Sequence, residues 1–147
     1  MAYIIDANVI LHGRGEINGE LITVPQVYGE VKSQMGQFKL QNMELSQREP
    51  ASKQIEEVKK LSKEINSPTS DTDEKLVALA LDLGECLMTD DRALQNLALH
   101  LDAVFEGFLD DPVREKREWK MVCQNCGREV EGDKCECGSS SILRKPR

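Results

Sequence analysis

Residues 70–91 read SDTDEKLVALALDLGECLMTDD, and this stretch decides the fold class of the chain. Apolar residues within 76–83 follow the i, i+3, i+4, i+7 spacing of an amphipathic helix, and Gly84 is placed to end it. The short apolar run Cys86–Met88 then predicts a strand. A helix that leads directly into a strand is typical of an α/β domain with a parallel sheet.

The same alternation continues on both sides of that stretch. We expect further strands at 2–5, 19–24, 42–47 and 103–105, with Asn8 in a turn after the first of them. We expect three further helices, whose buried stripes are Val27, Tyr28, Val31 and Met35 after Pro25; Ile55, Val58, Leu61 and Ile65 after Pro50; and Leu94, Leu97, Ala98 and Leu101.

The chain has 147 residues and a net charge of −7, and this charge divides by position. Residues 1–112 carry 20 acidic and 10 basic side chains, whereas residues 113–147 carry 6 acidic and 9 basic ones. The run Asp110-Asp111-Pro112 favours a hinge, because proline disfavours a helix through the residue before it. We therefore expect an acidic domain at 1–112, a basic linker at 113–120, and a cysteine module with a basic tail at 121–147.

Composition also bears on membranes and on location. No apolar run approaches 18 residues, so we expect no membrane partner. The first residues, MAYIID, lack the basic start and cleavage site of a signal peptide, so we expect a cytoplasmic protein. The acidic average argues against nucleic acid as a partner of the first domain, but residues 113–147, with a net charge of +3, suit phosphate groups.

Acidic residues stand at the ends of several predicted elements. Asp6 directly follows the first strand, Asp90 and Asp91 follow Cys86–Met88, Asp73 opens a helix, and Glu30 lies in another helix. In a parallel sheet the functional crevice lies beyond the carboxyl ends of the strands. Carboxylates that converge there repel one another unless a cation fills the site, and hard oxygen ligands select Mg²⁺ or Mn²⁺. Such ions activate water for phosphodiester hydrolysis.

Each acid also has a purely structural interpretation. Ser70 and Asp73 fit a capping box, and Asp90 or Asp91 could cap the helix that follows. A lone glutamate in a helix is usually solvated. Spacing alone therefore does not establish catalysis.

Four motifs in order carry a resemblance to the PIN-domain nucleases: YIIDAN at 3–8, VYGEV at 27–31, SDTDEKLVALA at 70–80 and MTDD at 88–91. The resemblance implies a three-layer α/β/α sandwich with a parallel sheet and a metal-dependent ribonuclease site. It assigns the catalytic, metal-binding acids to Asp6, Glu30, Asp73 and Asp91. It implies that Asn8 and Thr89 lie beside the metal, and that Asp71 and Asp90 tune the site.

Four cysteines lie within 15 residues of one another: Cys123, Cys126, Cys135 and Cys137. In a chain expected to be cytoplasmic, this spacing predicts a structural Zn²⁺ site with four thiolates. Disulfides or unrelated thiols are the alternative. The second pair is separated by one residue instead of the usual two, so Cys137 is the ligand that the spacing supports least.

A PIN-like domain followed by a zinc ribbon resembles the Nin-one-binding endonuclease family in its archaeal form. That resemblance implies cleavage of precursor small-subunit rRNA to form its mature 3′ end, on the pre-ribosomal small subunit. Two alternatives remain. One is a toxin-type PIN ribonuclease acting on tRNA or mRNA, and the other is a non-catalytic RNA-binding assembly factor.

Basic residues gather around the single tryptophan and at the end of the chain. Cations beside an aromatic ring suit single-stranded RNA, where phosphates pair with the cations and a base stacks on the ring. An alternative is that Trp119 packs the ribbon against the first domain. The residues expected to bind RNA are Arg114, Lys116, Arg117, Trp119, Lys120, Arg144 and Lys145.

Overall fold

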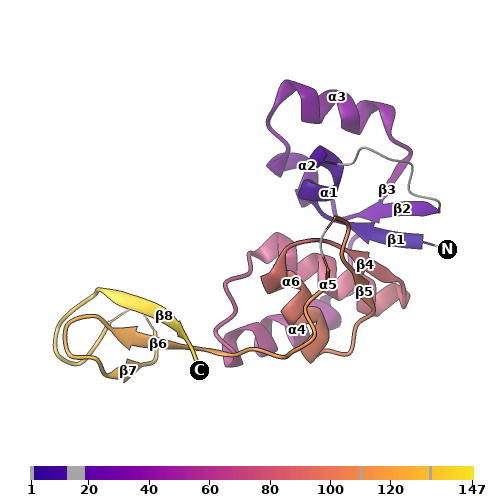
Figure 1. Ribbon diagram of the computed structural model, residues 1–147. Helices are drawn as coiled ribbons and strands as arrows, with labels where there is room; N and C mark the ends of the chain where they lie inside the picture. Colours follow the sequence, from indigo (N-terminus) through magenta and orange to yellow (C-terminus); the bar gives the residue numbers. More distant parts are fainter. Residues whose placement is uncertain (1, 13–18, 110, 133) are drawn as a thin grey trace.

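A parallel sheet with helices on both faces forms the larger unit of the computed structural model (Figure 1). The structure describes residues 2–12, 19–109, 111–132 and 134–147. Within these ranges the sheet has five strands in the order β3-β2-β1-β4-β5, and every neighbouring pair is parallel. The strands are β1 (Ala2–Ile5), β2 (Glu20–Thr23), β3 (Leu45–Gln47), β4 (Cys86–Met88) and β5 (Phe105–Glu106).

Helices cover the sheet in two layers, which Figure 1 shows above and below it. One layer holds α1 (Ala7–His12), α2 (Gln26–Glu30) and α3 (Gln34–Asn42). The other holds α4 (Ser52–Glu64), α5 (Asp71–Leu83) and α6 (Arg92–His100). The α/β/α sandwich expected from the sequence is thus confirmed. Its core lies on both faces of the sheet, with Ile4, Ile5 and Leu87 fully enclosed between the two helix layers.

Residues 70–91 fold into the helix and the strand that their pattern predicts. Helix α5 buries its apolar stripe and ends at Gly84, whose φ of 65° is a left-handed conformation that costs glycine little. The chain then turns directly into β4, so α5 runs antiparallel to the strand that it precedes. The N-terminus of α5 therefore lies at the carboxyl edge of the sheet, where α1 and α6 also begin.

Two described stretches, 7–12 and 26–43, differ from the sequence expectation. The helix after Pro25 ends at Glu30, because Val31 is extended and Ser33 begins a new helix by accepting a hydrogen bond from the backbone of Gly36. Met35 therefore does not share the buried stripe of α2 and is 67% exposed. The expected turn at Asn8 is helix α1, since the side chain of Asp6 caps it.

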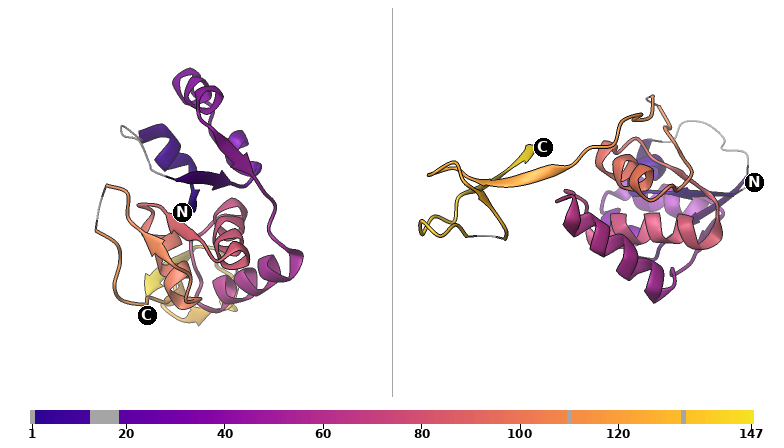
Figure 2. Two further views of the ribbon diagram at one scale, coloured as in Figure 1. Left: turned by 90° about the vertical axis from the view of Figure 1, so that its right-hand side faces the viewer. Right: turned by 90° about the horizontal axis from the view of Figure 1, so that it is seen from below.

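The C-terminal unit is a small antiparallel sheet. Strands β6 (Trp119–Cys123), β7 (Glu129–Val130) and β8 (Ile142–Pro146) pair in the order β7-β6-β8 among the described residues. Figure 2 shows this ribbon projecting from the larger unit. Strand β6 begins inside the segment 113–120 expected as linker, and Asp110 of the expected hinge lies outside the described residues. In the described part of the chain, no helix is both long and apolar enough to cross a bilayer.

Candidate active site and metal-binding cysteines

The carboxyl ends of β1 and β4 bring Asp6 and Thr89 together. Ile5 and Met88 are register partners in these parallel strands, so the next residue of each strand faces the other across the edge. The hydroxyl of Thr89 donates to Oδ2 of Asp6, and the backbone N–H of Val9 donates to its Oδ1 over 3.0 Å. Two donors thus fix the Asp6 carboxylate, which is only 5% exposed.

Two further carboxylates reach this edge from helix N-termini. Asp91 caps α6, with Oδ1 accepting from the backbone of Ala93 at 2.9 Å and of Leu94 at 3.2 Å. Asp73 forms a capping box with Ser70, whose backbone N–H donates to its Oδ2 over 3.0 Å. The structural interpretation of these acids is therefore correct, but it does not exclude the catalytic one. A cap fixes a carboxylate in place, and Oδ2 of Asp91 is outside its cap.

The three carboxylates affect one another electrostatically. Burial raises the pKa of Asp6 above its ordinary value, and repulsion from Asp91 and Asp73 raises it further. Burial also raises the pKa of Asp73, to which repulsion from Asp91 adds. Among the described residues, no lysine or arginine contributes to the pKa shift of Asp6 or of Asp73. Oxygen donors with excess negative charge are the donor set that Mg²⁺ and Mn²⁺ prefer, so these three acids are candidate ligands of a divalent cation.

Glu30 lies farther out than the other predicted acids. It is the last residue of α2 and is exposed. Helix α2 starts beyond the carboxyl end of β2, the strand next to β1, so Glu30 belongs to the same side of the sheet. It is not among the charges that shift the pKa of Asp6 or of Asp73. The structure brings three of the four acids close enough to raise one another's pKa values, and the role of Glu30 stays a prediction.

The neighbouring acids have other partners. Asp90 accepts hydrogen bonds from the backbone of Phe108 and Leu109, at 2.7 and 2.9 Å for the shortest of each, and so ties segment 107–109 to the site. Asp71 is exposed and pairs with Lys59 at 3.0 Å. A pocket of about 320 Å³ opens beside the cluster, and Asn8, Asp90 and Asp91 are among its lining residues.

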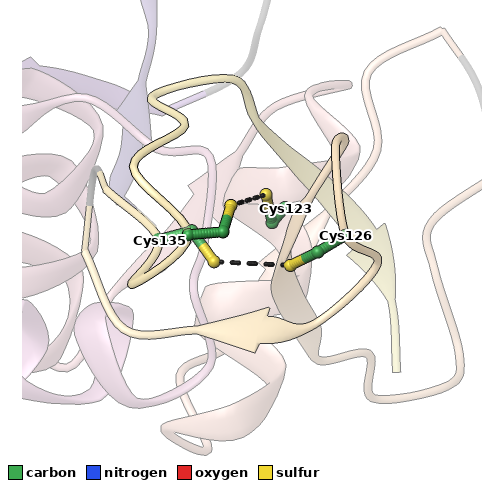
Figure 3. Close-up of side chains that lie close together, drawn as sticks. Cys123, Cys126 and Cys135 are labelled. Carbon is green, nitrogen blue, oxygen red and sulfur yellow. Dashed lines mark hydrogen bonds between the residues drawn. The ribbon is translucent and has the colours of Figure 1, made fainter.

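The four cysteines form one cluster in the ribbon. Their sulfur atoms all lie within 4.8 Å of one another, with 3.6 Å between Cys123 and Cys137 and 3.5 Å between Cys126 and Cys135 (Figure 3). A tetrahedron with metal–sulfur bonds of about 2.3 Å has edges of about 3.8 Å, so these separations fit one tetrahedral ion. They are far longer than a disulfide bond, which is about 2.05 Å. Cys137 lies in the cluster despite its unusual spacing.

The free thiols are unequal in acidity. The backbone N–H of Cys126 is the chief cause that lowers the pKa of Cys123 to about 6, and the backbone N–H of Ser139 lowers that of Cys137. The pKa of Cys135 rises to about 12, because burial and the neighbouring thiols outweigh a hydrogen bond from the Cys137 backbone. Metal binding therefore has to displace protons and weakens as the pH falls.

Comparison with known proteins places both units in one family. Residues 3–83 match the family described as the PIN domain of ribonuclease. Endoribonuclease Nob1 of Archaeoglobus fulgidus is 33% identical over an alignment that covers 97% of this chain and 90% of its own length. The chain belongs to this family of PIN-domain endoribonucleases.

Alignments with other Nob1 proteins also cover most of this chain. Endoribonuclease Nob1 of Methanocaldococcus jannaschii is 31% identical over 97% of this chain and 76% of its own length. Endoribonuclease Nob1 of Pyrococcus abyssi is 28% identical over 92% of this chain and 89% of its own length. The similarity therefore includes the ribbon as well as the PIN domain. It confirms the resemblance that the motifs carried, and the endoribonuclease class with it.

The basic residues that the sequence singled out lie on different surfaces of this Nob1-family chain. Trp119 and Arg144 lie on one face of the β6–β8 pair, because side chains alternate along a strand. Lys120 and Lys145 are register partners on the other face. Arg114, Lys116 and Arg117 are exposed on the segment before β6.

Sequence reasoning missed the residues that hold this segment to the PIN domain. Buried Asn96 forms two hydrogen bonds with the backbone of Arg117, at 3.0 and 2.7 Å, and buried Gln95 accepts from the backbone of Val113 at 3.0 Å. Nε2 of His100 is 2.9 Å from the carbonyl oxygen of Arg117. The sequence offers one signal for them, because Gln95 and Asn96 are adjacent amides between Leu94 and Leu97 of the apolar stripe.

Proposed function

We propose that this endoribonuclease cleaves precursor small-subunit rRNA to form its mature 3′ end, on the pre-ribosomal small subunit in the cytoplasm. The observation that carries the proposal is the convergence of Asp6, Asp73 and Asp91 at one edge of the sheet. The Nob1 relatives support the substrate class, because they match the chain through both its PIN domain and its ribbon.

Asp6, Asp73 and Asp91, with Glu30 from α2, would hold Mg²⁺ or Mn²⁺. When bound, such an ion supplies an activated water and charge stabilisation for the phosphodiester. Thr89 and the backbone of Val9 orient the Asp6 carboxylate, and the helix caps orient those of Asp73 and Asp91, so an arriving ion would meet carboxylates that are already ordered. Attack by water leaves a 3′-hydroxyl and a 5′-phosphate on the products.

The ribbon and the segment before it would supply RNA affinity. Zn²⁺ held by the four cysteines would be structural, since four protein ligands leave no position open for water. Lys120 and Lys145 face each other across two strands, and such a pair of like charges is unfavourable unless an anion lies near it. A backbone phosphate is an anion of that kind. Arg114, Lys116, Arg117, Trp119 and Arg144 complete the proposed RNA-binding set.

Cleavage of an RNA that spans the 3′ end of the small-subunit rRNA tests this function. We expect cleavage with Mn²⁺ and none without it. Asp6→Asn and Asp91→Asn should each lower the rate by more than about a hundredfold. Losing a residue that hydrogen-bonds to a metal ligand costs about ten- to a hundredfold, and losing the ligand itself should cost more. Glu30→Gln shows whether α2 contributes.

The control is Glu57→Gln, which removes an exposed carboxylate of α4 that lies outside the cluster. It should cleave at the wild-type rate. The proposal fails if Asp6→Asn is fully active. Products that end in a cyclic phosphate would contradict it as well, because water would then not be the attacking group.

A further inference from the structure

A second pocket lies between α6 and the segment before the ribbon. Its volume is about 500 Å³. Three arginines and the single tryptophan line it, together with one carboxylate: Arg92, Arg114, Arg117, Trp119 and Glu115. Arg92 comes from the first turn of α6, and the others come from the segment that crosses over that helix.

The crossing segment is fixed in place and is not a loose tether. Gln95 and Asn96 are 1% and 2% exposed. Asn96 forms two hydrogen bonds with the backbone of Arg117, and the side-chain oxygen of Gln95 accepts from the backbone N–H of Val113. At the far end, the backbone N–H of Trp119 donates to the carbonyl of Ile65 over 2.9 Å, and the side chain of Asn66 donates to the carbonyl of Trp119 over 2.8 Å. The pocket is therefore already formed in the free protein.

The chemistry of the lining selects the ligand class. Three guanidinium groups against one carboxylate give a net positive pocket, and guanidinium pairs well with phosphate oxygens. Trp119 offers an indole to a planar ring. We propose that this pocket binds one nucleotide of single-stranded RNA, with its base on Trp119 and its phosphates on Arg92, Arg114 and Arg117. This inference rests on the proposed function and deepens it by adding Arg92 and a position for the substrate.

The pocket is joined to the acid cluster through the first turn of α6. Ala93 lines the pocket, and its backbone N–H donates to Asp91 over 2.9 Å. Arg92 directly follows Asp91, which also lines the smaller pocket beside the acids. An RNA strand that crosses the N-terminus of α6 thus passes from the acids to the arginines. A nucleotide held in the larger pocket fixes where the strand meets the acids.

Trp119 is the only tryptophan in the sequence, so its fluorescence reports on this pocket directly. The experiment uses full-length, zinc-loaded protein carrying Asp6→Asn, to prevent cleavage, and an oligouridylate of about eight nucleotides. We expect the emission of Trp119 to be quenched as the RNA binds, and a duplex RNA of the same length to leave it unchanged. Binding by anisotropy of labelled RNA without quenching would overturn the proposal, and so would an absence of binding.

Two variants test the contacts. Trp119→Leu should weaken binding about tenfold, the scale of one stacked base. Arg92→Gln should lower the slope of log affinity against log salt by about 0.7, the value for one phosphate contact to a single strand. Lys60→Gln, an exposed charge on α4, is the matched control and should leave the slope unchanged. Equal slopes for Arg92→Gln and Lys60→Gln would remove Arg92 from the site.

Parallel cleavage assays on the wild-type chain separate this inference from the proposed function. Cleavage without quenching would overturn the pocket alone. Quenching without Mn²⁺-dependent cleavage would overturn the proposed function and leave the nucleotide pocket in place.

Discussion

The PIN domain and the ribbon are stabilised by opposite means. The PIN domain encloses a continuous apolar core, from Ile4 and Ile5 on the sheet to Leu76 and Leu94 on its helices. Among the described residues of the ribbon, the buried apolar side chains are Val122 and two cysteines. The larger unit can therefore fold by hydrophobic burial, whereas the ribbon needs another source of free energy.

The metal-binding groups act in opposite directions in the two units. In the PIN domain, the carboxylates of Asp6, Asp73 and Asp91 repel one another, so the groups proposed to hold the catalytic ion work against folding. In the ribbon, the sulfur atoms of four cysteines converge on one point, so the groups proposed to hold zinc would also stabilise the fold. The proposed metal ligands therefore destabilise the PIN domain before an ion binds, whereas those of the ribbon stabilise it once zinc is bound.

Removal of zinc should have the largest effect on stability. Chelation or Cys126→Ser should unfold the ribbon and leave the PIN domain folded, because structural zinc sites contribute on the order of 10 kcal/mol. Hydrogen exchange measures this, with fast exchange in β6 and β8 and retained protection in β1 and β4. Cys86→Ser, a change in the PIN core, is the control and should keep zinc bound. Retained protection in β6–β8 after chelation would contradict the view that the ribbon, unlike the PIN domain, needs zinc to fold.

A smaller effect tests the boundary between the units. Asn96→Ala should destabilise the PIN domain by about 2 kcal/mol, because it leaves backbone groups of Arg117 without their partner. Chemical denaturation measures the loss, and the amide of Arg117 should exchange faster. Gln41→Ala, at an exposed amide on α3, should change neither quantity. Unchanged exchange at Arg117 would mean that the crossing segment does not belong to the PIN domain.

The smallest effect is on the pH dependence of stability. Burial raises the pKa of Asp73 above 3.8, so the folded state keeps its proton to a higher pH than the unfolded state does. As the pH rises above 3.8 the folded state binds more protons than the unfolded state, and the free energy of unfolding contributed by this group falls.

Asp73→Asn should flatten that fall, since asparagine keeps an oxygen for the capping box but carries no charge. Denaturation of zinc-loaded protein without Mg²⁺ or Mn²⁺, from about pH 4 to about pH 7, measures it. Asp71→Asn, at an exposed site on the same helix turn, supplies the comparison. A profile for Asp73→Asn as steep as that of the wild type would show that this carboxylate does not oppose folding.

The spacing of residues along the chain is sufficient to predict several helices and strands and the cysteine cluster. The apolar repeat of α5, the glycine that ends it and the run of β4 depend on neighbours in sequence, so the helix and strand were predicted where they lie. The four cysteines were predicted as one site because they are close along the chain. The acids were predicted as a set because strand ends meet at one edge of a parallel sheet. The resemblance to PIN-domain nucleases then assigned the catalytic role to Asp6, Glu30, Asp73 and Asp91.

Which distant groups lie together depends on how the strands and helices pack in the folded chain. Asp6 and Thr89 are 83 residues apart and come together because β1 and β4 pair in register. Helix α3 and the break at Val31 were not visible in the pattern, because a cap at Ser33 competes with a continuous helix and packing settles the outcome. The crossing segment looked like a linker, yet Asn96 binds it to α6. A hydrogen bond between distant segments leaves no periodic trace in the sequence, because its partners are brought together only when the chain has folded.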